Sequence, residues 1–66
     1  MNLFTPPKRV KGNLVGVDGN AIFLLAYFRK QAKNQGWSGD EIRLVSTEAK
    51  SGDYKNLIRV LDEHLE

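Results

Sequence analysis

Apolar residues recur at helical spacing over the stretch from Asp18 to Gly36. Steps of three and four residues gather side chains on one face of a helix. Asp18 is placed to accept hydrogen bonds from the N–H groups of a first turn, and Gly36 to end the helix in the left-handed conformation. The pattern predicts a helix over residues 19–35, with an apolar stripe of Ala21, Leu24, Leu25, Phe28 and Ala32.

Four more apolar residues of this helix lie off the stripe: Ile22, Phe23, Ala26 and Tyr27. They widen the apolar surface past half of the circumference, so something must cover part of it. We expect residues 13–17 (NLVGV) to form a short extended segment that lies over this surface.

A second helix is predicted by the residues around Ser38. Ser38 and Glu41 have the spacing of a capping box, and Trp37 and Ile42 that of a hydrophobic staple. This is the most specific local signal in the chain, and it predicts a helix over residues 39–50.

A third helix follows Ser51-Gly52-Asp53. We expect Gly52 to end the second helix and Asp53 to cap the third, over residues 54–65. Its apolar stripe is Tyr54, Leu57, Ile58, Leu61 and Leu65.

The first 12 residues mix apolar and basic side chains around Pro6 and Pro7, which exclude a helix there. We interpret residues 1–12 as a flexible, solvated basic arm and residues 13–66 as a single domain. The predicted fold class is all-α: a compact three-helix bundle with a partly extended N-terminal arm.

Charge is distributed unevenly along the 66 residues. Residues 1–36 hold six Lys and Arg against Asp18 alone, and residues 37–66 hold four against seven Asp and Glu, so the net charges are +5 and −3. We favour packing of the two halves against each other, with partial neutralisation, over an external anionic partner.

Several kinds of chemistry are disfavoured by the composition. The chain has no cysteine and one histidine, His64, so it offers no thiol nucleophile, no disulfide and no His-metal cluster. The neighbouring carboxylates Asp40-Glu41 and Asp62-Glu63 point about 100° apart on a helix and do not converge on a substrate. We therefore expect a protein that is not an enzyme, has no metal or cofactor, and is cytoplasmic, since no apolar run is long enough for a membrane span.

Two contact surfaces remain as hypotheses. Phe23 and Tyr27 lie one turn apart off the main stripe, and an exposed aromatic pair of this kind is typical of a site for a protein partner or for homo-oligomerisation. Burial of the pair by the arm is the alternative. We predict a small protein-interaction module that uses this patch.

The second hypothesis is nucleic-acid binding, which we place below protein contact. Lys8, Arg9 and Lys11 in the arm and Arg29, Lys30 and Lys33 in the first helix are candidates for phosphate contacts. The second and third helices also have a helix-turn-helix outline that would display Lys55, Asn56 and Arg59, but acidic residues on the same helix would repel a duplex.

Short motifs in the chain resemble known groups of proteins. Val-Asp-Gly-Asn-Ala (residues 17–21) and Ser-Gly-Asp-Tyr (residues 51–54), with Gly36-Trp37-Ser38 between them, are similar to motifs of short uncharacterised bacterial and phage proteins, over residues 13–61. That group implies no activity. Gly36-Trp37-Ser38 is also similar to the first loop of ubiquitin-associated-type domains, which implies a three-helix fold, although the segment before Gly52 is longer here.

Overall fold

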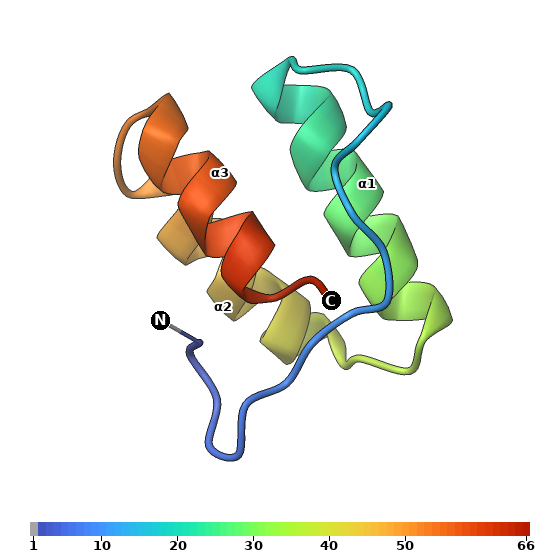
Figure 1. Ribbon diagram of the computed structural model, residues 1–66. Coiled ribbons are helices and arrows are strands. Elements are labelled where there is room, and N and C mark those ends of the chain that lie inside the picture. The colour runs from blue at the N-terminus through green and yellow to red at the C-terminus, as the bar shows by residue number, and fades with distance from the viewer. Residues whose placement is uncertain (1) are drawn as a thin grey trace.

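A computed structural model describes residues 2–66 and contains three helices. They are α1 (Ala21–Asn34), α2 (Gly39–Lys50) and α3 (Tyr54–Glu63), and each helix contacts the other two (Figure 1). The predicted all-α three-helix bundle is confirmed. The observed helix bounds lie within two residues of the predicted ones.

The start of α1 differs from the prediction in its capping residue. Asn20, rather than Asp18, is the N-cap, because its side-chain oxygen accepts the Ile22 N–H at 3.0 Å. Asp18 lies one step earlier and accepts the Asn20 N–H at 2.9 Å, which forms a turn that leads into the helix. The end of α1 is as predicted, since Gly36 has a φ of 91°.

The caps of α2 and α3 are confirmed. Ser38 Oγ accepts the Glu41 N–H at 3.2 Å, and Glu41 Oε1 accepts the Ser38 N–H at 2.8 Å, so both halves of the capping box are present. At the start of α3, the Asp53 carboxylate accepts the Asn56 N–H at 2.9 Å.

Gly52 follows the end of α2, as predicted, but it does not have the left-handed conformation of Gly36. The α2 helix ends at Lys50, and Gly52 is not among the glycines with positive φ. Instead, the Asn56 side chain passes close by and donates to the Glu48 carbonyl at 3.0 Å, which also accepts the N–H and the hydroxyl of Ser51 at the end of α2. A Cβ at Gly52 would lie 2.9 Å from the Cβ of Asn56, so glycine leaves room for this hydrogen bond.

The core lies where the three helices meet. The predicted stripe of α1 is buried except at the partly buried Ala21, whereas Tyr54, predicted to be part of the α3 stripe, is 51% exposed. Tyr54 begins its helix at the edge of the bundle, where its hydroxyl donates to the Gly19 carbonyl. The buried apolar residues are Val10, Leu24, Leu25, Phe28, Ala32, Trp37, Val45, Ala49, Leu57, Val60, Leu61 and Leu65.

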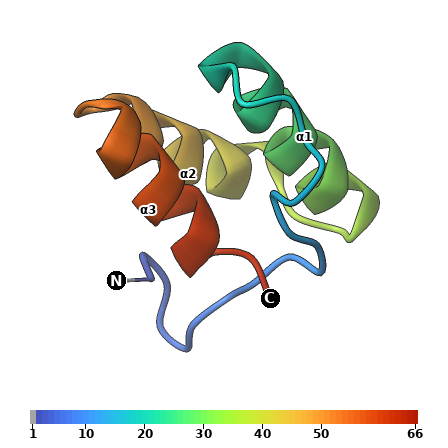
Figure 2. The ribbon, with the colours of Figure 1, turned by 45° about the horizontal axis from the view of Figure 1, so that its top comes forward.

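The N-terminal segment is packed against the helices. Val10 is fully buried and makes a short parallel bridge with Leu65, in which the Val10 N–H donates to the His64 carbonyl at 2.8 Å and the Glu66 N–H to the Val10 carbonyl at 2.9 Å. Figure 2 shows the segment passing beside the C-terminus. Residues 2–12 therefore belong to the folded unit, in contrast to the separate, solvated arm predicted, because Val10 completes a core that the helices leave open.

His64 lies at the centre of this junction and is fully buried. Its Nδ1 is 2.7 Å from the Val60 carbonyl oxygen, and its Nε2 accepts the Leu3 N–H at 3.0 Å. The ring is therefore neutral, with its proton on Nδ1. Burial is the main cause that lowers the pKa of His64 below its usual value, and the positive charge of Arg9 acts in the same direction.

Aromatic rings continue the junction toward α1. Phe4 lies edge-to-face with both His64 and Trp37, at centroid distances of 5.8 Å and 5.3 Å, and Trp37 contacts Phe28 in the same way at 5.6 Å. These rings connect the N-terminal segment, the start of α2 and the core face of α1.

Candidate contact surface on helix α1

The structure separates the two aromatic residues of the predicted contact patch. Phe23 is 55% exposed, but Tyr27 is half-buried beneath the N-terminal segment. The Tyr27 hydroxyl accepts the Asn13 N–H at 3.3 Å, and a Cβ at Gly12 would lie only 2.5 Å from it. The segment therefore covers Tyr27 and leaves Phe23 as a contact candidate.

Phe23 belongs to an exposed face of α1 that is apolar in its first half. Its neighbours Ile22, 70% exposed, and Ala26 are also exposed. The second half of the same face is basic, since helical spacing brings Arg29, Lys30 and Lys33 into line with these residues. We call this surface the outer face of α1, and it consists of Ile22, Phe23, Ala26, Arg29, Lys30 and Lys33, all exposed.

The basic half of the outer face of α1 is not neutralised within the chain. Its three cations form no ion pair with any of residues 2–66; they are Arg29, Lys30 and Lys33. Between the two halves of the chain, the structure shows the ion pair of Lys8 with Glu41, whose atoms are 2.6 Å apart. The expected neutralisation of one half by the other is therefore limited, and a positive surface remains on α1.

The basic residues of the N-terminal segment do not join that surface as one cluster. Lys8 is engaged by Glu41 and lies 5.1 Å from the centroid of Trp37, so it is not free for a phosphate. The Lys8 hydrogen bond also lowers the pKa of Glu41. Lys11 is exposed, and its backbone exchanges hydrogen bonds of 2.7 Å and 2.9 Å with the Gln35 side chain beyond the end of α1. Arg9 is exposed as well.

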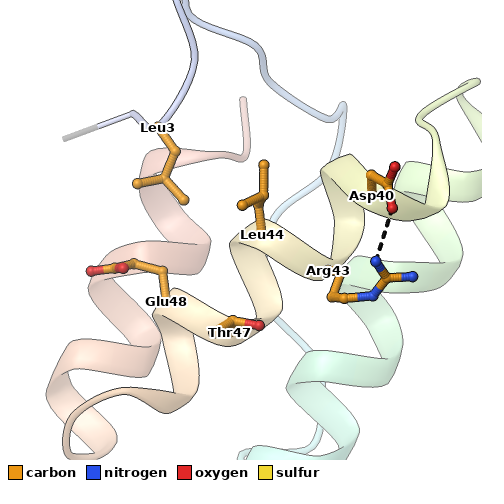
Figure 3. A pocket seen from close by; sticks show the side chains of 6 residues that line it. All are labelled: Leu3, Asp40, Arg43, Leu44, Thr47 and Glu48. Atoms are coloured by element: carbon orange, nitrogen blue, oxygen red, sulfur yellow. Dashed lines mark hydrogen bonds and ion pairs between the residues drawn. The ribbon is translucent and has the colours of Figure 1, made fainter.

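A second exposed apolar surface lies over α2, and the sequence analysis did not identify it. Leu3 is 42% exposed and Leu44 57% exposed, and they face a shallow groove of about 540 Å³ (Figure 3). Arg43 pairs with Asp40 at 2.8 Å at one end of the groove. We call this the α2 groove, and its lining residues are Leu3, Asp40, Arg43, Leu44, Thr47 and Glu48. The available signal was that Leu44 lies off the helix face shared by Ile42, Val45 and Ala49.

The predicted helix-turn-helix surface is occupied by contacts within the chain. The Arg59 guanidinium donates to Glu63 at 2.7 Å and to the Asn56 side-chain oxygen at 2.6 Å, while the Asn56 amide group caps α2. Lys55 is exposed. Two of the three side chains expected to read a duplex are therefore held by other residues.

Within residues 2–66 no three His, Asp or Glu side chains are grouped to hold a metal ion, and no helix has the length and apolar character to cross a membrane.

The resemblances to short bacterial and phage proteins and to ubiquitin-associated-type domains stay predictions. Comparison of the chain with family models, curated proteins and solved structures found no match.

Proposed function

We propose that this protein is a small protein-interaction module that binds its partner through the outer face of α1. The observation that carries the proposal is the combination, on one exposed helix face, of Phe23 and Ile22 with three cations that have no ion pair in the described chain. Large exposed apolar residues grouped in this way are typical of interaction sites.

The charge on this face determines the chemistry of the partner. Two α1 helices packed in parallel would bring their basic halves together, and two packed antiparallel would place the basic half of each over the apolar half of the other. The parallel arrangement opposes like charges, and the antiparallel one buries cations that have no partner. The matching surface is therefore apolar at one end and acidic at the other.

Site-specific photo-crosslinking in the native cell tests this proposal. A photoreactive phenylalanine analogue at position 23 is expected to form a covalent adduct with a protein, and the charge reversals Lys30→Glu and Lys33→Glu together are expected to reduce its yield at least several-fold. The matched control carries the analogue at Val15, which is 89% exposed but lies outside the outer face of α1. Equal yields at positions 23 and 15 would overturn the proposal.

Nucleic-acid binding is the second candidate, favoured by the exposed cations Arg29, Lys30 and Lys33 together with Arg9 and Lys11. The apolar half of the outer face of α1 has no role in contacts with phosphates, so we place this candidate second. Titration with duplex and single-stranded DNA at low salt distinguishes the two functions. Phosphate contacts predict an affinity that falls steeply as salt is raised, whereas lack of binding at low salt removes this candidate.

A further inference from the structure

We propose that the partner of the outer face of α1 is the α2 groove of a second copy of this chain. This inference rests on the proposed function, because it names the partner of the same surface. It requires that the two surfaces, which lie on different helices, are complementary in shape, polarity and charge.

The α2 groove has the properties that the outer face of α1 requires. Its apolar part is formed by Leu3 and Leu44, both substantially exposed, which lie on either side of the open groove in Figure 3. Its charged part contains two carboxylates and one guanidinium, so its net charge is negative. Apolar residues and negative charge are thus adjacent, as they must be opposite Phe23 and Lys30.

Glu48 is the carboxylate available to the second copy. Asp40 is held by Arg43 at 2.8 Å, but the exposed side chain of Glu48 forms no ion pair within residues 2–66. In the isolated chain an acidic group at one surface and three cations at the other are therefore left unpaired. Contact between two copies would bring these opposite charges together.

The spacing along the two helices also matches. Glu48 follows Leu44 by four residues, which is about 6 Å along a helix at about 1.5 Å per residue. Lys30 follows Ala26 by the same four residues. When Leu44 packs level with Ala26 of the other copy in a parallel arrangement, Glu48 comes level with Lys30.

Sedimentation and light scattering over a range of protein concentrations test this inference. The expected result is a mean mass that rises with concentration above the 7.5 kDa of one chain. Phe23→Ser and Leu44→Ser should each restore the monomer mass, because each removes one side of the same contact. Val15→Ser is the matched control, since it removes a still more exposed apolar residue outside both surfaces and should leave association unchanged.

A charge exchange gives the sharper test of the pairing. Lys30→Glu and Glu48→Lys are each expected to weaken association, whereas an equimolar mixture of the two variants should associate again, because the reversed charge of one copy meets the reversed charge of the other. Circular dichroism of each variant checks that these exposed substitutions leave the helices intact.

Two results would overturn the inference. The first is a wild-type chain that keeps the monomer mass up to about 1 mM, where any Kd tighter than that would be visible. The second is an association that Phe23→Ser and Val15→Ser change equally. Monomeric behaviour combined with a crosslinked adduct to a different protein at position 23 would overturn this inference while supporting the proposed function, so the two are tested separately.

Discussion

Val10→Asp is expected to unfold most of the protein at 25 °C. Val10 is fully buried where the N-terminal segment meets α3 and the C-terminus, and both its N–H and its carbonyl are hydrogen-bonded there. A carboxylate at this position would be removed from water inside the core, and breaking the balance of buried charge costs about 3–5 kcal/mol. A single core in a chain of this size supplies about the same amount of stability. Urea unfolding followed by circular dichroism measures the loss.

Val15→Asp is the matched control for this prediction, because it makes the same chemical change at a residue that is 89% exposed. Substitutions at such surface positions change the free energy of unfolding by about 0.5 kcal/mol or less. If Val10→Asp unfolds at the same urea concentration as Val15→Asp, the N-terminal segment contributes nothing to the stability of the bundle, and its packing against α3 has no energetic consequence.

The features that were predicted correctly from the sequence depend on contacts between residues that are close together in the chain. Ser38 and Glu41 are three residues apart and satisfy each other's backbone N–H groups, so their spacing was enough to locate the start of α2. The left-handed φ of Gly36 also follows from local geometry. The α1 cap was misplaced because Asp18 and Asn20 are both good capping residues, and only the backbone path distinguishes them.

Hydrophobic periodicity could not predict that the two ends of the chain meet. The Leu3 N–H and the His64 ring are 61 residues apart in the chain, and no pattern within either segment specifies that they meet. The basic residues near Val10 suggested a solvated arm, although Val10 itself is apolar and buried. The exposure of the two aromatic contact candidates could not be predicted for the same reason. The path of the N-terminal segment determines that Tyr27 is covered and that Phe23 is not.

Acidification is expected to destabilise the protein in two separate ranges of pH. His64 is neutral when folded and its pKa is lowered by burial, so the unfolded chain binds a proton more readily than the folded one. Its contribution is fully present above the unfolded pKa of about 6.5 and is lost as the pH falls toward the lower folded pKa. The pKa of Glu41 is also lowered, but its contribution is present above its usual pKa and is lost only in more acidic solution.

The pH range in which His64 affects stability can be measured separately, because His64 is the only histidine in the chain. The slope of the free energy of unfolding against pH, measured by urea unfolding between pH 7 and pH 5, should reach up to about 1.4 kcal/mol per pH unit in the wild type. His64→Asn should be less stable at neutral pH but should lose this slope. Arg9→Gln, which removes an exposed charge that lowers the His64 pKa, should keep the fold and reduce the slope.

Nuclear magnetic resonance titration of the single imidazole provides an independent check that needs no variant. Protonation of Nε2 would place an N–H against the Leu3 N–H, which now donates to it at 3.0 Å, so the folded protein should resist that proton. The imidazole resonances should therefore titrate below the usual range, together with amide signals of the N-terminal segment. A His64 that titrates near 6.5 without perturbing those amides would contradict the buried junction, because it would place the ring in water.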